Sequence, residues 1–522
     1  MADPDTTRVP SLWDRTLDTP EFHQYLDHLP LKQLCGICNG AIAKGDICVG
    51  RDSPDHPELL CLRHFWRYVS GLDLAARLAE TPDPDPEEER LEVPLREVVR
   101  WERGTSKPEV SKGPLPVIRL TIDSRGIRRV ESFTEEQARY RHERYDDRLF
   151  VVQGTSDAQL EGITALFQDG LMRLRIPQWQ SNLHLWDLPT PPTFPASIPQ
   201  GDESAPRVVQ LLQEPREKDS RSYSIDLNAV TGVTFFFANY LGMVYIHGHT
   251  RDRPYASIPS GLSPNGMCWL YVPISKNDRI LSLDLRSRDS EFPMKWPSIL
   301  MRTELTGQNI FGTFLRSEFP IYSLGTTPTM LFFTRSSLLG HITRIGTVSS
   351  PTASRVAPSY PLPTAEDIVP NFLAMDHLVK FSSAPLNGVK TASVFHQDSQ
   401  PDASCLGILF DYENGGKRAV GQCRLGLDYY RVYERPTHVC VRNMLHLPDG
   451  EPELQWTVKA QFSRGKDHLH EGEGRDIHCF ELRDNILDFW FTAREFCIEI
   501  RRQDQAPGSS EWNSHAYAIS TS

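Results

Sequence analysis

Four of the ten cysteines and two of the histidines lie close together near the N-terminus, between residues 35 and 65. They include two spaced pairs, Cys35-x2-Cys38 and Cys61-x2-His64, separated by 22 intervening residues. A CxxC pair in a tight turn brings two thiolates to one side. A CxxH pair that opens a helix does the same, because positions i and i+3 share a face. Three thiolates and one imidazole make the tetrahedral set that suits Zn2+, so we expect these four residues to bind one zinc ion.

Such a zinc site would be structural. Four protein ligands leave no open position for water, so the ion would stabilise its own small module and take no part in catalysis. Cys48 and His56 are left over, and either could replace one of the predicted ligands. The helical spacing of His64 favours it over His56. Buried thiols beside a surface histidine are the alternative to a metal site.

The segment around these ligands is similar to a known group of zinc modules. Gly40 and Gly45-Asp46 fit a knuckle followed by a hairpin, and the Cys61-x2-His64 pair fits a ligand-bearing helix. This combination resembles the treble-clef zinc fingers, which include the LIM and RING modules, over about residues 32–70. LIM and RING patterns carry eight ligands for two ions, and this segment has too few for a second complete site. The resemblance implies a rigid interaction module with one zinc ion.

Two histidine groups further along the chain are weaker candidates. His247-Gly-His249 would place both imidazoles on one face of a strand, but the sequence indicates no third ligand. His468, His470 and His478 lie in the acidic segment DHLHEGEGRDIH. We favour exposed polar strand residues for the first group and a charged loop for the second.

Motifs for catalysis are missing from the sequence. It contains no G-x-S-x-G, no P-loop, no G-x-G-x-x-G after a strand and no H-E-x-x-H. Carboxylate pairs for glycoside hydrolysis have no fixed spacing, so a glycan-active hydrolase stays open. The remaining six cysteines are scattered singly, which is typical of buried thiols in a reducing compartment.

Composition and charge restrict the classes of partner that the chain can bind. The chain has 522 residues, 40 of them proline, and a formal net charge of -12, which argues against nucleic-acid binding through net charge. MADPDTTRVP has no apolar signal-peptide core. The longest uncharged run, 227–250, carries too many polar groups for a membrane span. We expect an intracellular protein, cytoplasmic or nuclear, with no membrane or nucleic-acid partner.

Changes in composition divide the chain into modules. We expect a zinc-binding module over 1–80, an acidic Pro-rich linker over 81–113, and a first β unit over 114–200. A second β unit follows over 221–347 and a third over 365–505, the third being either separate or continuous with the second. Proline-rich stretches separate these units.

Short alternating runs predict antiparallel strands after residue 114. VIRLTI and IRRVESF flank the turn DSRG, GVTFFFANYLGMVYIHGHT turns at 239–242, and GILFDYENGGKRAVGQ turns at Asn414-Gly415-Gly416. LQWTVKAQF alternates throughout, as a half-buried strand does. No strand–helix–strand alternation follows residue 150. We therefore predict a mainly β fold of antiparallel β-sandwich or β-prism-like units, with a small α+β zinc module at the N-terminus.

The order of strands over 223–315, and a similar unit at 405–425, resembles jacalin-type β-prism repeats. The features are the strand after Asp278-Arg-Ile280 and the turn region from Thr303 to Gly312. The family's Gly-x-x-x-Asp sugar-binding loop is missing there, although 472–476 fits that short pattern. The overall texture also resembles large proteins of filamentous fungi, which implies no activity.

These observations favour a non-catalytic recognition or scaffold protein. The zinc module would be a rigid interaction element, and the β units would bind a protein or glycan partner. The alternative is an enzyme, either a glycan-active hydrolase on the β scaffold or a ubiquitin-ligase-type adaptor that uses the zinc module. The sequence predicts neither the oligomeric state nor the identity of the ligand.

Overall fold

The computed structural model describes most of the chain after residue 90. The described residues are 49–50, 59–60, 91–113, 115–123, 126–134, 148–154, 160–168, 170–175, 185–191, 207–211, 220–238, 242–251, 254–255, 267–287, 297–315, 319–336, 341–349, 379–396, 403–446, 455–465 and 477–503. Within these ranges the protein is mainly β and forms several sheets, as the sequence predicts. The only regular helix among them is the 3-10 turn η2 (Leu95–Glu97).

The chain divides into two compact units. Unit 1 comprises Met1–Ile198, Pro215–Tyr223 and Ser257–Gly261. Unit 2 comprises Pro199–Glu214, Ser224–Ala256 and Leu262–Ser522. Strand β13 (Ser220–Asp226) begins in unit 1 and ends in unit 2.

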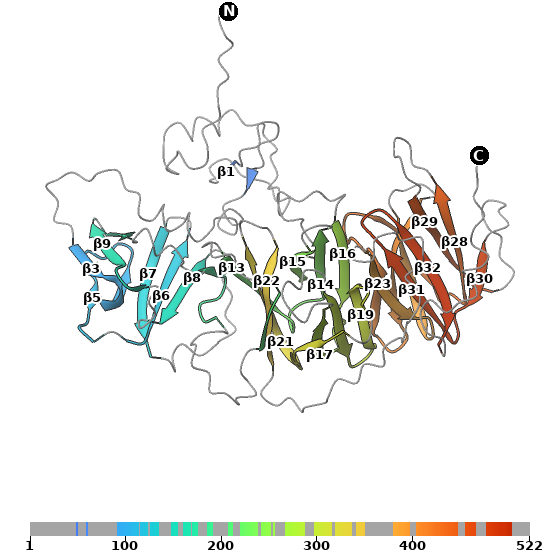
Figure 1. The fold of residues 1–522 in the computed structure, drawn as a ribbon, viewed down its shortest axis with the longest axis horizontal. Coiled ribbons are helices and arrows are strands. Elements are labelled where there is room, and N and C mark those ends of the chain that lie inside the picture. Colours follow the sequence, from blue (N-terminus) through green and yellow to red (C-terminus); the bar gives the residue numbers. More distant parts are fainter. Residues whose placement is uncertain are drawn as a thin grey trace, which may run out of the picture. The chain divides into compact units, whose positions relative to one another are not determined.

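The described part of unit 1 contains two main sheets, one with the order β10-β9-β3 and one that includes β11-β8-β6-β7-β4-β5 (Figure 1). Their strands are β3 (Leu91–Pro94), β4 (Val98–Glu102), β5 (Glu109–Val110), β6 (Val117–Asp123), β7 (Gly126–Phe133), β8 (Leu149–Gly154), β9 (Thr164–Gln168), β10 (Leu171–Arg175) and β11 (Leu185–Trp186). The pairs within each sheet are antiparallel, and β11 also pairs in parallel with β13. The short strands β1 (Val49–Gly50) and β2 (Leu59–Leu60) pair antiparallel further towards the N-terminus.

Both main sheets of unit 1 contribute to one apolar core. Ile118 and Leu120 on β6 lie in the same buried cluster as Phe167 on β9 and Leu174 on β10. Side chains alternate along a strand, so Val117, Arg119 and Thr121 of β6 lie on the other face of the larger sheet. The predicted hairpin of VIRLTI and IRRVESF is confirmed by the pairing of β6 with β7.

Unit 2 contains the remaining strands, arranged in five described groups. Their orders are β12-β22-β21, β15-β14-β16, β20-β17-β18-β19-β23-β31-β32, β26-β25-β24-β27 and β29-β28-β30 (Figure 1). The bounds are β12 (Arg207–Gln210), β14 (Gly232–Ala238), β15 (Gly242–His249), β16 (Met267–Pro273), β17 (Ile280–Arg286), β18 (Ser298–Thr303), β19 (Gly307–Thr313), β20 (Ile321–Thr326), β21 (Pro328–Ser336), β22 (Ile342–Ser349), β23 (Lys380–Pro385), β24 (Val389–His396), β25 (Cys405–Tyr412), β26 (Lys417–Gly421), β27 (Tyr429–Glu434), β28 (His438–His446), β29 (Gln455–Ser463), β30 (His478–Glu481), β31 (Asn485–Phe491) and β32 (Phe496–Arg502).

Local sequence signals account for several of these strands. The two strands predicted on either side of the turn at 239–242 are confirmed by the antiparallel pairing of β14 with β15, and Gly242 at the start of β15 has a φ of 75°. The predicted turn between β25 and β26 is also confirmed, with Gly415 at a φ of 84° and the Asn414 side chain accepting the Gly416 N–H. On β29 burial alternates strictly, with Trp456, Val458, Ala460 and Phe462 buried.

Several ionic side chains are buried in unit 2, and Arg418, Lys380 and Asp488 are among them. Arg418 on β26 donates to the carbonyl oxygens of Thr306, Gln308 and Ser383, at 2.6, 2.7 and 3.2 Å. Lys380 on β23 donates to the Thr313 hydroxyl at 3.1 Å and lies 5.2 Å from the Phe237 ring centroid. Asp488 on β31 accepts from Arg501 on β32 at 2.6 Å. A buried charge without such partners would cost several kcal/mol, so these contacts stabilise the way the strands meet.

Candidate functional site

The outer face of the larger unit 1 sheet carries charged residues at alternate positions of neighbouring strands. On β6 and β7, Arg119 lies opposite Glu131, and Thr121 lies opposite Arg129. Glu131 also lies opposite Arg100 of β4 on its other side. The strand pairing therefore brings three arginines around one carboxylate, in a part of the sheet that Figure 1 shows at β6 and β7.

Glu131 binds two of these arginines at once. Its two carboxylate oxygens accept from Arg119 at 2.8 Å and from Arg129 at 2.9 Å. Arg119 also donates to the carbonyl oxygen of Pro189 at 3.1 Å, and its guanidinium carbon lies 5.0 Å from the Phe133 ring centroid. The Arg119 and Glu131 side chains are 20% and 21% exposed, so solvent screens their charges only in part.

Donors outnumber acceptors in this arrangement. Each guanidinium carries five N–H groups, and the Nε atoms of Arg119 and Arg129 are buried without a hydrogen-bond partner among the described residues. Buried polar groups are normally hydrogen-bonded, and an unsatisfied donor costs about 1–3 kcal/mol. The site therefore favours an additional acceptor, and a negatively charged one above all.

Two adjoining hollows surround Arg119, Arg129 and Glu131, and we call them together the arginine hollow. Their volumes are about 480 and 120 Å3, and they share Arg119, Arg129, Glu131 and Pro189. Together they are lined by five arginines against three glutamates: Arg100, Arg119, Arg128, Arg129, Arg148, Glu102, Glu109 and Glu131. The hollow is thus locally basic in a chain whose formal net charge is -12.

The aromatic rings at this face are not available for stacking. Phe133 and Phe150 belong to a small buried cluster with Val117 and Val152, and they are only 9% and 3% exposed. A sugar ring stacks on an exposed aromatic face, and neither ring of the hollow presents one. Because both oxygens of Glu131 accept from arginines, this carboxylate is also poorly placed to act as the nucleophile of a hydrolase.

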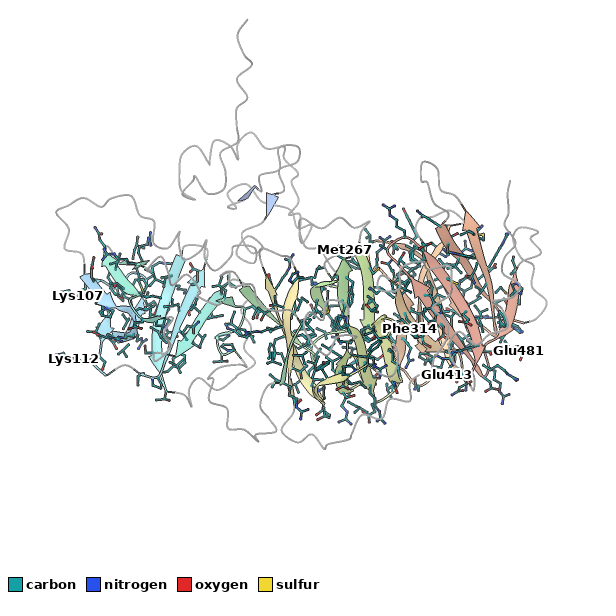
Figure 2. All side chains as sticks on the ribbon, viewed as in Figure 1. Lys107, Lys112, Met267, Phe314, Glu413 and Glu481 are labelled. Atoms are coloured by element: carbon teal, nitrogen blue, oxygen red, sulfur yellow. The ribbon has the colours of Figure 1, made fainter. Side chains whose placement is uncertain are left out.

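A second hollow of about 480 Å3 lies in unit 2, between the starts of β24 and β28 and the turn after β30. Glu413 and Glu481, which are labelled in Figure 2, line it together with Arg483 and His438. His438 Nδ1 is 2.9 Å from the Thr437 hydroxyl. Charges of both signs line this hollow, and they favour no single class of ligand.

The predicted zinc ligands Cys35, Cys38, Cys61 and His64 lie outside the described residues, as do Cys48 and His56. Elsewhere, among the described side chains, no three His, Cys, Asp or Glu residues are grouped closely enough to hold a metal ion.

His247 and His249 lie on β15 with ring centroids 4.9 Å apart, as their spacing predicts. The expectation that both are exposed is wrong for His249, which is buried. Its two ring nitrogens lie 2.6 Å from the Thr234 hydroxyl and 2.9 Å from the Pro254 carbonyl oxygen. Burial lowers its pKa, which favours the neutral ring, and the two hydrogen bonds occupy both possible metal-binding atoms.

The expectation of buried thiols is confirmed for five of the six described cysteines and is wrong for Cys479. Cys268, Cys405, Cys423, Cys440 and Cys497 are buried, and Cys479 is exposed. Burial raises the pKa of Cys268 to about 11, which keeps that thiol unreactive at neutral pH. Trp186, Trp269, Trp456 and Trp490, which could have stacked on sugars, are core residues.

The sequence contained a signal for the arginine hollow that motif searches do not detect. Arginine or glutamate occupies alternate positions of two strands that flank a short turn: Arg119 on one, and Arg129 and Glu131 on the other. In a hairpin such positions must meet on one face. Arg148 and Pro189 join the hollow through pairing between distant segments, and no sequence pattern indicates them.

Comparison with known proteins gives no family for this chain. No family model matches it, and no curated protein is significantly similar to it. Within the described ranges, no helix has the length and the apolar composition needed to cross a membrane.

Proposed function

We propose that this chain is a non-catalytic recognition protein, and that the arginine hollow of unit 1 binds an acidic segment of a protein partner. The observation that carries the proposal is the surplus of donors around Glu131, where two half-buried arginines share one carboxylate. The planar fork of a guanidinium matches a carboxylate in a bidentate arrangement. Aspartate and glutamate side chains of an extended peptide would supply the missing acceptors.

Two features favour a peptide over a glycan at this site. The hollow has no exposed aromatic ring on which a sugar could stack. Its arginines are spread over neighbouring strands of one sheet face, so that successive acidic side chains could each meet one. The two sheets of unit 1 enclose one core, and we infer that unit 1 is a β-sandwich that holds this face rigid.

The test is binding of a fluorescein-labelled octaglutamate peptide to the full chain, followed by fluorescence anisotropy at several salt concentrations. We expect Arg119→Gln to weaken binding at least tenfold, about 1.4 kcal/mol, because it removes a charged bidentate donor. Arg175→Gln is the matched control, since it removes an exposed arginine that also binds a glutamate, Glu92 at 3.0 Å, on the other sheet.

The outcomes separate clearly. Binding should weaken as salt rises, and a length-matched serine peptide should not bind. Equal loss in Arg119→Gln and Arg175→Gln would contradict a specific site. If an acidic oligosaccharide binds and the peptide does not, the partner at this hollow is a glycan and the proposed protein partner is wrong.

For the N-terminal segment, we propose a treble-clef-like module with one structural Zn2+ held by Cys35, Cys38, Cys61 and His64. The spacing of the two ligand pairs supports it. The antiparallel pairing of β1 with β2 also supports it, because a hairpin directly before Cys61 is what such a module requires. Metal analysis of the purified chain should give one equivalent of zinc, lost in Cys35→Ser and retained in Cys48→Ser. Well under one equivalent in the wild type would refute the site.

A further inference from the structure

Strand β27 presents apolar side chains to solvent at the end of a sheet. It is the last strand in the order β26-β25-β24-β27, and no described strand pairs with its outer side. Tyr429 and Tyr430 are each 60% exposed and Val432 is 51% exposed. An exposed apolar edge strand is a template for pairing with another strand, unless it is blocked.

The register with β24 shows which residues point outward. β27 pairs antiparallel with β24, and the Arg435 N–H donates to the Lys390 carbonyl oxygen at 2.7 Å. Backbone groups alternate in direction along an antiparallel strand. Arg435 and the other odd-numbered residues of the strand therefore bond to β24. Tyr430, Val432 and Glu434 direct their N–H and C=O groups away from the sheet.

One outward group already has a partner inside the chain. Arg464 donates from Nε to the Glu434 carbonyl oxygen at 2.7 Å and lies 3.5 Å from its carboxylate. The Arg464 side chain is 64% exposed, so it can leave this position at little cost. It partly protects the C-terminal end of the edge and leaves the centre of the strand open.

We propose that β27 pairs antiparallel with β27 of a second copy of this chain, about a two-fold axis at Val432. In a symmetric pair, outward residues must face outward residues. Within Tyr429–Glu434 only two such registers pair five residues, one centred on Arg431 and one on Val432. Centring on Arg431 sets that arginine opposite its own copy, which like-charge repulsion disfavours.

Centring on Val432 gives complementary neighbours at every position. Val432 meets Val432, Arg431 meets the ring of Tyr433, and Tyr430 meets Glu434, with no like charges opposed. Tyr430, Val432 and Glu434 then exchange backbone hydrogen bonds with the second copy. The pairing joins two four-stranded sheets into one continuous sheet.

The first test is the association of the full chain, measured by sedimentation equilibrium. The protein concentrations are about 1–100 μM, the range in which a weak edge-to-edge dimer dissociates. We expect a reversible dimer. Val432→Pro should weaken it at least about tenfold, because each copy loses one interstrand N–H donor. Proline is tolerated on edge strands where the N–H faces solvent, so the variant should remain folded. Val432→Thr keeps the branched shape and is the matched control, and Arg464→Ala should strengthen the dimer.

The second test fixes the register. Under mild oxidation Val432→Cys should form a disulfide-linked dimer, because the two copies of that residue face each other across the axis. Arg431→Cys should not, since its neighbour is Tyr433. A chain that stays monomeric up to about 100 μM overturns the proposal. A dimer whose dissociation constant is unaffected by Val432→Pro overturns it as well. Cross-linking through Arg431→Cys in place of Val432→Cys also overturns it, because it would select the other register.

Discussion

Replacing Lys380 by methionine is expected to stabilise unit 2 at neutral pH. Lys380 is buried on β23, and burial lowers its pKa from 10.5 to about 8. Because the folded pKa lies below the unfolded one, the unfolded state binds the proton more tightly. Stability is therefore reduced below pH 8 and recovers as the pH rises towards 10.5. A difference of 2.5 units corresponds to about 3 kcal/mol at 1.36 kcal/mol per unit.

The net gain should be smaller than this full amount. Methionine loses the hydrogen bond to the Thr313 hydroxyl and the contact with the Phe237 ring. A hydrogen bond to a charged group contributes roughly 1.5–3 kcal/mol, which leaves a gain of about 1 kcal/mol at pH 7. The pH dependence is the sharper signature. The advantage of the variant should fall by about 3 kcal/mol between pH 8 and pH 10.5 and change sign within that window.

The assay is urea denaturation of wild type and variant across this pH range, read as the difference between them at each pH. Groups that titrate in both proteins and do not interact with Lys380 then cancel. Cys268 is the exception, because the charge of Lys380 lowers its pKa. Lys390→Met is the matched control, because it removes an exposed lysine of β24, the next strand along the chain. A pH-independent difference for Lys380→Met would refute the reasoning, because it would mean that Lys380 is as easily charged in the folded state as in the unfolded one.

Three further predictions concern single contacts in unit 2. Diamide should link Cys440 on β28 to Cys479 on β30, which lie directly opposite in the antiparallel register, and peptide mapping should lose this link in Cys479→Ser but keep it in Cys497→Ser. Arg501→Met should destabilise unit 2 by about 3–5 kcal/mol in urea denaturation, because it leaves the buried Asp488 without its ion pair, and adding Asp488→Asn should recover part of the loss. Gly421→Ala should lower the free energy of unfolding by roughly 1–3 kcal/mol, because Gly421 has a φ of 67° and an added Cβ would lie 2.5 Å from the Leu406 carbonyl oxygen. Gly415→Ala should lower it less, because no atom lies within 4 Å of an added Cβ there.

Sequence patterns predicted the strands well where the physical signal is local. The turn at Asn414-Gly415-Gly416 needs glycine for its backbone angles, and the alternation from Trp456 to Phe462 reports a half-buried face. Neither signal depends on the rest of the chain. The same locality explains why the β6–β7 hairpin, and with it half of the arginine hollow, follows from the sequence.

The order of the sheets and the buried charges could not be predicted in this way. An arginine in a strand is expected to be exposed, yet Arg418 is buried. Two of the carbonyl oxygens that accept from it, those of Thr306 and Gln308, lie 112 and 110 residues away along the chain. His249 is buried because Thr234 and Pro254 satisfy its ring. Periodicity describes which residues share a face, and it carries no information about which distant group will lie against that face.

The seven-stranded sheet of unit 2 has a consequence for how the chain is made. Its strand β19 ends at Thr313, and its neighbour β23 begins at Lys380. During synthesis at about 5–20 residues per second, the edge of β19 waits roughly 3–13 s for its partner to be made. During that interval the nascent chain contains β17, β18, β19 and β20 but not β23, so one edge of β19 is unpaired. Translation speed and chaperone access between residues 313 and 380 should therefore affect the yield of folded protein.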